Sequence, residues 1–510
     1  MTVALPPERR LPRRLTRAPG AIVLPRIPAP AALLLAGWTL LLAAWTFGNP
    51  PFLAPDEGAH YLRAVAVGEG KLGADLEPTV PARLWGAWRH PAGSTCNAGQ
   101  SDVPATCVED VDRLTADVKV ATSAGAYPPL YYVLPGALLH LADDPFSALR
   151  LGRMGGALVG LVFLALAVAL LVARDAPRVS LLGLLVAVTP MVVFVQSSLN
   201  SSGLEIPAGI AFFAALLRLA RGDPARWVWG AAFAAGAALA LTRAPGMLWI
   251  GIDLVLFAAL VGARGALRAV RAAPPWAVVP AAVVAVGIVA SRLWEHAHGN
   301  PITQQGPAAA GGLSEIRFWL WHGIQELPRT FNEQVGVFGW LDTIMPKVFY
   351  PAWHAMVAGL VVVALITARR RERWVLAGAV VAVLGVTAVA SATLVAATNQ
   401  DVQGRHVLPL AVVVPLLAGE LVYRNRARLA LVDLGALFSW FAALAAVMHA
   451  VGWYANAYRQ SVGTSGPRYF LPHAEWSPPL GWATWLVLAF AGAALLAASA
   501  AGPPRWRLRR

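Results

Sequence analysis

Acidic, basic and aromatic residues that could do chemistry cluster in four short segments of the chain. In the first, PDEGAHYLR, Asp56 and Glu57 directly follow an apolar stretch, His60 comes one helical turn later, and Arg63 comes one turn after that. Carboxylates are costly beside hydrocarbon, so an Asp-Glu pair at this place indicates a functional site. The structural alternative is a helix capped by Asp56, and the two combine if Glu57 caps while Asp56 does the chemistry.

The second segment, FNEQVGVFGWLDT, mixes glycines and aromatic residues with Asn332, Glu333, Trp340 and Asp342. Glycine lets a backbone approach a ligand closely, and aromatic rings stack on a sugar or an isoprenoid. An aromatic belt at the membrane interface would also explain Trp340 and Phe338. It would not explain the three polar residues, which we expect to bind substrate.

The third segment is NQDVQGRH, with Gln403, Arg405 and His406, and the fourth is QSSLNSSGLE, with Asn200 and Glu205. The planar fork of Arg405 suits a phosphate, although an arginine that snorkels to the interface is the alternative. We expect Asn200 and Glu205 to face one cavity. Helix capping by the serines explains most of the remaining fourth segment.

The rest of the chain has the composition of a polytopic membrane protein. Of its 510 residues, 57% are hydrophobic and 13% charged, where a soluble domain carries about 25% charge. The mean hydropathy is +0.58. This excludes a soluble enzyme. Blocks long enough to cross a bilayer lie at 30–48, 149–173, 179–196, 203–220, 227–242, 245–262, 276–293, 351–368, 374–398, 407–423, 429–453 and 481–501.

Alternate connections between these blocks are rich in arginine, which predicts that they and both termini lie in the cytoplasm. The arginines concerned are Arg174, Arg178, Arg221, Arg226, Arg264, Arg268, Arg271, Arg369, Arg370, Arg371, Arg373, Arg424, Arg426 and Arg428. They also account for much of the net charge of +14 without nucleic acid as a partner. The apolar stretch 127–141 would invert this pattern as a span, so we place it at the outer interface as a short or re-entrant helix.

The sequence thus predicts an all-α membrane protein of about twelve transmembrane helices, with short interfacial helices in large outer loops. Its parts are a basic cytoplasmic segment at 1–29, a transmembrane domain at 30–501 with outer loops at 49–148, 294–350 and 454–480, and a basic cytoplasmic tail at 502–510. Cys96 and Cys107, the only cysteines, lie in the first outer loop, where their spacing suits a disulfide in an oxidising compartment. Two free thiols are the alternative.

Five ordered motifs carry a resemblance to a known family. They are PDEGAH, YPPLYY, QSSLNSSG, FGWLDTIMP and VQGRHVLPL, and the combination resembles the bacterial membrane-protein family called domain of unknown function 2142, from about residue 30 to 500. That family is similar in turn to the GT-C superfamily of glycosyltransferases, which take sugars from polyprenyl-phosphate carriers on the outer face of the membrane.

The resemblance implies roles for particular residues. Asp56 matches the acid after the first helix that serves as base or metal-associated carboxylate, with Glu57 beside it, so a divalent metal at Asp56 stays open. The second expected acid is not an aspartate, and Glu205 is the nearest candidate. Tyr127 precedes the paired prolines in place of a frequent lysine, so that phosphate binding rests on Arg405, Arg63 or His406.

We therefore expect a plasma-membrane glycosyltransferase of a bacterium that moves a sugar from a polyprenyl-phosphate donor to an envelope glycan or lipid acceptor outside the cell. The alternatives are a transporter or flippase of lipid-linked saccharides and a non-catalytic protein of envelope assembly. A transporter should hold paired charges near the middle of the membrane. The charges within or beside the expected helices, which we place near their ends, are Arg243, Asp253, Arg292, Glu420 and Asp433.

Overall fold

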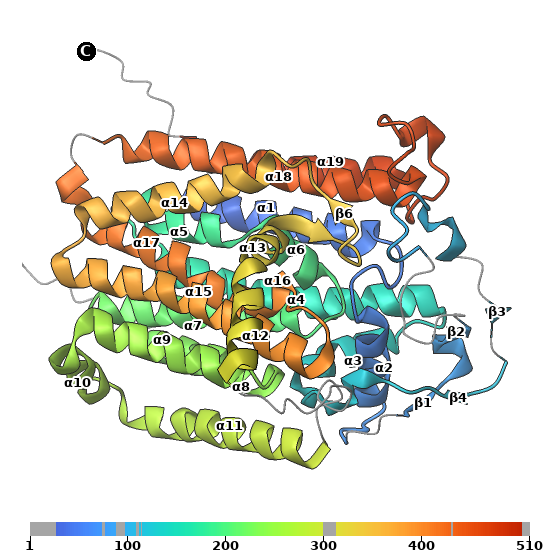
Figure 1. Ribbon diagram of the computed structural model, residues 1–510, viewed down its shortest axis with the longest axis horizontal. Coiled ribbons are helices and arrows are strands. Elements are labelled where there is room, and N and C mark those ends of the chain that lie inside the picture. Colours follow the sequence, from blue (N-terminus) through green and yellow to red (C-terminus); the bar gives the residue numbers. More distant parts are fainter. Residues whose placement is uncertain are drawn as a thin grey trace, which may run out of the picture.

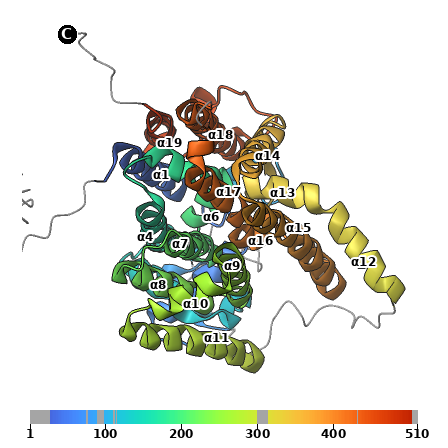
Figure 2. The ribbon, with the colours of Figure 1, turned by 90° about the vertical axis from the view of Figure 1, so that its left-hand side faces the viewer.

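The computed structural model is a bundle of long helices with a few short strands (Figure 1 and Figure 2). It describes residues 27–73, 77–87, 97–108, 112–113, 115–298, 313–429 and 432–501. The tail at 502–510 and most of the N-terminal basic segment lie outside these residues. The α-helices are α1 Ala29–Gly48, α2 Glu57–Gly68, α3 Val133–Leu139, α4 Pro145–Leu171, α5 Pro177–Ala187, α6 Pro190–Ser197, α7 Ser202–Ala220, α8 Arg226–Thr242, α9 Gly246–Val261, α10 Ala263–Arg271, α11 Val278–His298, α12 Leu313–Gln325, α13 Leu327–Gly336, α14 Phe349–Thr367, α15 Arg370–Thr398, α16 Gly404–Ala411, α17 Val413–Arg424, α18 Leu434–Val462 and α19 Gly481–Ala498.

Shorter elements join these helices. The 3₁₀ turns are η1 Ala82–Leu84, η2 Ala105–Val108, η3 Ser123–Ala126, η4 Pro129–Tyr132, η5 Pro275–Ala277, η6 Arg426–Leu429 and η7 Leu471–His473. The strands are β1 Thr79–Val80, β2 Gly86–Ala87, β3 Asp112–Arg113, β4 Val118–Lys119, β5 Val337–Phe338 and β6 Thr343–Ile344. They form three antiparallel pairs, β1 with β4, β2 with β3 and β5 with β6.

The all-α polytopic architecture expected from the sequence is confirmed. Among the described residues, nine helices are long and apolar enough to cross a membrane, and two pairs of helices bent at a break raise this number to eleven. The expected block 227–242 is α8, which has 17 residues. The count of about twelve spans stays a prediction.

The arginine-rich connections meet at one end of the bundle, on the left in Figure 1. Arg221 Nη1 donates to Leu171 O at the end of α4, and Arg424 Nη2 donates to Ala220 O at the end of α7. Arg428 Nη1 reaches Thr367 O at the end of α14, and Arg371 Nε reaches Ala259 O at the end of α9. The arginines therefore share one end, as their alternation in the sequence predicts, and we call it the arginine-rich end.

The first loop lies at the opposite end, around α2, α3 and the β1–β4 pair, on the right in Figure 1. The apolar stretch expected at the interface forms η4 and α3, whose combined helix is too short to be a candidate span. Cys107 in this loop is disulfide-bonded. Its expected partner Cys96, the only other cysteine, lies outside the described residues.

Breaks in the helices turn polar segments inward. Helices α5 and α6 meet at 66°, where Pro190 begins α6 and Thr189 caps it by accepting from Val192 N. The turn after α6 is consequently buried, not an exposed outer loop: Asn200 is 3% exposed. The serines there do not cap α7, since Ser201 makes no side-chain cap and Asn200 Oδ1 accepts from Ser202 N instead.

One charge lies elsewhere than expected. Asp253 is in the middle of α9, not near its end, and it is 2% exposed. It has no ion-pair partner among the described residues. The expectation that charges lie near helix ends is therefore wrong for Asp253.

Candidate active site

Asp56 occupies the N-cap position of α2, but its side chain does not cap the helix. Its backbone is left-handed, with φ 65°, and no cap hydrogen bond forms. Instead Asp56 Oδ2 lies 2.5 Å from Arg405 Nη2. A left-handed aspartate costs energy and persists only where its surroundings hold it. The side chain is 54% exposed, so that the carboxylate stays accessible while it is held.

Arg405, in the first turn of α16, is held in the protein and does not extend to the interface. Its side chain is 6% exposed. Nη1 donates to Pro55 O over 2.8 Å, and Nε lies 3.4 Å from His406 Nε2. One guanidinium therefore joins the loop before α2 to the loop before α16. The snorkelling alternative does not describe this side chain.

Glu333 fixes the backbone from which Arg405 projects. Its Oε2 accepts from Gly404 N at 2.7 Å, and its Oε1 accepts from Arg329. Burial raises the pKa of Glu333, although Gly404 N and Arg329 oppose the rise. Glycine is needed at 404 because a Cβ there would lie 2.7 Å from Glu333 Cβ and from Gln334 N. Glu333 thus supports the site from behind.

A small cavity opens beside the Asp56–Arg405 pair. Its lining includes Pro55, Gln403 and Arg405, together with Gly339 and Leu341 from the β5–β6 turn. Gln403 Oε1 is buried without a hydrogen-bond partner among the residues that the structure describes. A buried amide oxygen of this kind favours a donor from a ligand or a water molecule. Gln403 therefore lines this cavity with an amide oxygen that can accept a hydrogen bond, and its role in binding stays a prediction.

His60 packs among aromatic rings behind Asp56. Its Nδ1 lies 2.6 Å from Tyr132 Oη, and its ring centroid is 5.3 Å from that of Tyr127. Burial lowers the pKa of His60 to about 3, with Arg405 and Arg243 adding to the shift and Asp56 opposing it. The imidazole is therefore neutral at pH 7 and can polarise or accept, but it does not supply a positive charge.

Arg243 is a functional candidate that the sequence analysis noted only as a charge near a helix end. Its guanidinium carbon lies 5.5 Å from the centroid of the Tyr127 ring. Nη1 bonds Ser202 Oγ at 2.9 Å and Glu205 Oε2 at 3.2 Å. Although burial opposes it, contact with Tyr127 and Glu205 raises the pKa of Arg243, so the group stays charged. Both Arg243 and Arg405 lie outside the arginine-rich connections. This feature of the sequence could have identified them as site residues.

The positive charges around Asp56 determine its protonation. Desolvation is the largest single effect and raises the pKa of Asp56, but the charge and hydrogen bond of Arg405 together with His60 and His406 outweigh it, so the net pKa lies below its ordinary value. Asp56 is therefore ionised at neutral pH. An ionised, accessible carboxylate beside a guanidinium can accept a proton or bind a cation.

Several residues that were predicted to belong to the site are buried and contact other parts of the protein. Glu57 is 0% exposed and forms a two-pronged ion pair with Arg153 of α4, at 2.7 and 2.6 Å, while Leu199 N donates to its Oε1. Both of its oxygens are occupied, which favours a positioning role over a catalytic one. Arg63 is 1% exposed and donates to Leu72 O and Tyr127 O, so phosphate binding by Arg63 is not supported.

Neither Asn200 nor Glu205 lines the cavity beside Arg405, and the prediction that they face one cavity stays a prediction. Asn200 Nδ2 donates to Pro55 O over 3.3 Å, which supports the residue before Asp56. Glu205 is 0% exposed and accepts from Trp249 Nε1 and from Arg243. These two residues therefore brace the site from two different elements.

The aromatic residues of the middle loop pack against other parts of the protein. Phe338 is 0% exposed within the core, and Trp340 Nε1 donates to Phe52 O. Asn332 Oδ1 lies 3.1 Å from His354 Nε2, and Asp342 Oδ2 bonds Arg459 Nη2 at 2.8 Å. This segment ties the first loop to α18 and α14, so substrate binding by these residues stays a prediction.

Potential metal ligands gather at a different place from Asp56. Among the described residues, one group of three has ligand atoms within 4.8 Å of one another: His322, Glu326 and Asp401. Arg329 lies 2.5 Å from Glu326 Oε2 and 3.5 Å from Asp401 Oδ2. The arginine thus already forms an ion pair with both carboxylates. Among the described residues, no such group includes Asp56.

Comparison with known proteins identifies the chain's family. The family model described as "Predicted membrane protein (DUF2142)" matches residues 39–414. Among solved structures, the chain is similar to the crystal structure of ArnT from Cupriavidus metallidurans in the apo state, with 15% sequence identity and a TM-score of 0.44 over 93% of this chain and 78% of that one. No curated protein matches the sequence.

Proposed function

The chain belongs to the DUF2142 family of predicted membrane proteins, and from this and the site geometry we propose that it is a membrane glycosyltransferase. The proposed reaction moves a sugar from a polyprenyl-phosphate donor to a hydroxyl of an envelope glycan or lipid on the outer face of the plasma membrane. We take the end of the bundle opposite the arginine-rich end to be the outer end. The site around Asp56 is at that end.

One observation carries the proposal: Asp56 has the most exposed side chain among the acids of the four motifs, and the next, Asp401, is 36% exposed. The side chain of Asp56 is 54% exposed, whereas the side chains of Glu57 and Glu205 are 0%, that of Glu333 is 4% and that of Asp342 is 10% exposed. Each of those four is held in an ion pair that is more buried than that of Asp56. Asp56 is therefore the motif acid that is most accessible to a substrate.

The chemistry assigned to Asp56 is general-base catalysis. Its carboxylate takes the proton of the acceptor hydroxyl as that oxygen bonds to the anomeric carbon of the sugar. The bond between the anomeric carbon and the phosphate oxygen breaks, and its electron pair leaves with the polyprenyl phosphate. Direct attack inverts the anomeric centre. Such a base contributes about 10² to 10⁴ in rate.

Arg405 and Arg243 supply positive charge for the leaving phosphate. Arg405 pairs with Asp56 in the free protein, and a bound phosphate would compete for the same guanidinium. Two fixed guanidinium groups stabilise negative charge that develops as the bond breaks, because they need little reorganisation. His406, beside Arg405, and Gln403 complete the polar wall on this side.

The test is a deletion strain complemented with wild type, Asp56→Asn or Asp175→Asn. Asp175 is a matched control, because it is also 54% exposed and also pairs with an arginine, but at the arginine-rich end. Mass spectrometry would measure envelope glycans and polyprenyl-linked sugars. We expect wild type and Asp175→Asn to restore one sugar, and Asp56→Asn to leave its lipid-linked donor unused.

Protein amounts in the membrane must match among the variants for the comparison to count. Full restoration by Asp56→Asn would reject Asp56 as the base. Loss of the glycan with no accumulation of a lipid-linked sugar at the outer face would reject transfer as the missing step.

The transporter alternative has one supporting observation, the buried Asp253 in the middle of α9. Transporters place such charges on the path of an ion or substrate, usually with a partner. If the protein is a flippase, Asp253→Asn should stop the lipid-linked sugar from reaching the outer leaflet. If it is a transferase, Asp253→Asn should retain glycan assembly.

A further inference from the structure

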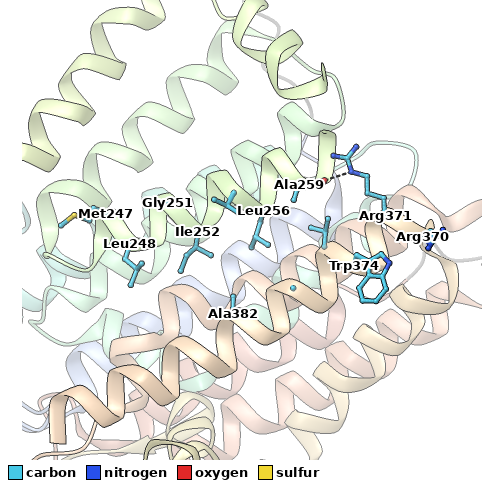
Figure 3. Close-up of a pocket in the computed structure, with 13 residues that line it drawn as sticks. Met247, Leu248, Gly251, Ile252, Leu256, Ala259, Arg370, Arg371, Trp374 and Ala382 are labelled. Carbon is cyan, nitrogen blue, oxygen red and sulfur yellow. Dashed lines mark hydrogen bonds between the residues drawn. The ribbon is translucent and has the colours of Figure 1, made fainter. Parts of the chain in front are cut away.

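A long apolar groove lies between α9 and α15, away from the candidate active site. Its volume is about 1110 Å³, and Met247, Ile252 and Leu256 of α9 line it opposite Val375, Gly378 and Ala382 of α15. Figure 3 shows these side chains along the two helices. From Met247 to Ala259 the groove follows thirteen residues of helix, a rise of about 18 Å. One leaflet of a bilayer has about 15 Å of hydrocarbon, so the groove can hold one acyl chain.

Two arginines lie at the mouth of the groove at the arginine-rich end. Arg371 Nε and Nη2 donate to Ala259 O and Ala258 O, which fixes its guanidinium over the end of α9 (Figure 3). The close approach requires Gly262, with φ 80°, because a Cβ there would lie 2.4 Å from Arg371 Nη1. Arg370 is exposed beside it. A positioned guanidinium and a free one therefore face whatever fills the groove.

The surroundings of the mouth match the interface of a membrane. Helix α10 turns by 109° from α9. Its arginines Arg264 and Arg268 are exposed, and its Leu267 and Val270 are 48% and 67% exposed. An amphipathic helix of this kind lies along the headgroup region. Trp374, 71% exposed at the lip of the groove, is a residue type that favours the same depth.

We propose that this groove binds one anionic glycerophospholipid, with its phosphate at Arg370 and Arg371 and an acyl chain between α9 and α15. The occupant is argued from charge complementarity: an apolar slot of leaflet length ends in arginines at the level of the headgroups. It is distinct from the lipid-linked donor of the proposed reaction, whose phosphate would lie near Arg405 at the other end of the bundle. The inference does not rest on the proposed function.

The experiment uses the full-length protein purified in mild detergent, with equal amounts of dioleoyl phosphatidylglycerol and dioleoyl phosphatidylethanolamine added. Native mass spectrometry would count the lipids retained. We expect one phosphatidylglycerol to be retained in preference to phosphatidylethanolamine. The double variant Arg370→Gln/Arg371→Gln should weaken its retention roughly thirtyfold, since each arginine near a headgroup contributes about a factor of five.

A second variant fills the groove without touching the arginines. A Cβ at Gly378 meets no atom within 4 Å, and the same holds for Gly359 on α14, which does not line the groove. Gly378→Trp should lose the phosphatidylglycerol and Gly359→Trp should keep it. This pair remains informative if the arginine variant does not fold.

Three results would overturn the proposal. The two lipids could be retained equally by the wild type, which would indicate unspecific boundary lipid. Retention could be unchanged in both the arginine and the Gly378→Trp variants, which would place the lipid elsewhere. Added undecaprenyl phosphate could displace phosphatidylglycerol and stay bound, which would make the groove an isoprenoid site.

Discussion

Asp56 combines two properties that the other acids of the motifs lack: a left-handed backbone and a side chain that is more than half exposed. A strained aspartate costs about 1 to 3 kcal/mol. This cost does not serve helix capping, because the side chain makes no cap. The left-handed backbone instead directs the carboxylate to Arg405, which is where a catalytic role would need it.

The pH dependence of transfer should report the Asp56–Arg405 contact. Because Arg405 lowers the pKa of Asp56, the carboxylate of the wild type protonates only at acidic pH, and activity should fall there. In Arg405→Gln the pKa of Asp56 rises, so the acidic limb of kcat/KM should move to higher pH by about one unit or more. The measurement is residual transfer in proteoliposomes between about pH 4 and about pH 8.

The control for this shift is Arg426→Gln. Arg426 pairs with Asp175 at the arginine-rich end, so its loss removes an equivalent arginine far from Asp56. Its pH profile should coincide with that of the wild type. An acidic limb that stays in place in Arg405→Gln would show that a group other than Asp56 controls it.

Helices α1, α2 and α4 are held together beneath the site by Glu57 and Arg153. Arg153 is 2% exposed, and besides Glu57 it bonds Asn49 O and Pro50 O in the loop after α1. The pair thus fixes the loop that carries Asp56. Removing one partner from a buried pair leaves an uncompensated charge, which costs more than the pair gains.

We expect Arg153→Met to lower the free energy of unfolding by about 3 to 5 kcal/mol. The double variant Glu57→Gln/Arg153→Met should lose less than the sum of the two single changes, because it leaves no buried charge unpaired. Thermal unfolding in detergent measures both. Lys71→Ala, in an exposed pair with Glu69, is the control and should cost at most about 1 kcal/mol. Strictly additive losses would contradict the coupling.

The two ends of the bundle differ in their polar residues and loops. Arginines tie the ends of α4, α7, α9 and α14 together at one end, while the first loop with its disulfide-bonded Cys107 lies at the other. The positive-inside rule then predicts which end faces the cytoplasm.

Cysteine labelling in intact cells tests this orientation. Asp143 is 100% exposed at the end of the first loop, and Asp175 is 54% exposed at the arginine-rich end. A maleimide that cannot cross the membrane should label Asp143→Cys in intact cells and Asp175→Cys only after lysis. The disulfide keeps Cys107 from adding background. The reverse pattern would invert the topology and place the proposed site in the cytoplasm.

Much of the fold could be read from the chain, because the bilayer imposes simple rules on it. A span needs a long apolar block, and arginine collects on one side, so the helices and the shared end of Arg221, Arg371 and Arg424 follow from local composition. Local pattern also indicated that Tyr127 begins a short outer segment. None of these inferences requires knowledge of which helices touch.

The roles of the polar residues depended on contacts between distant segments. Glu57 and Asp56 are adjacent in the chain, yet one is buried against Arg153 and the other is exposed beside Arg405. Nothing local distinguishes them, because burial is set by α4 and α16, which lie about one hundred and three hundred and fifty residues further on. The position of Arg243 in the site likewise depends on contacts between segments that are distant in the sequence. The side-chain types in the sequence indicate which chemistry is feasible. The packing of distant segments determines which of these side chains a substrate can reach.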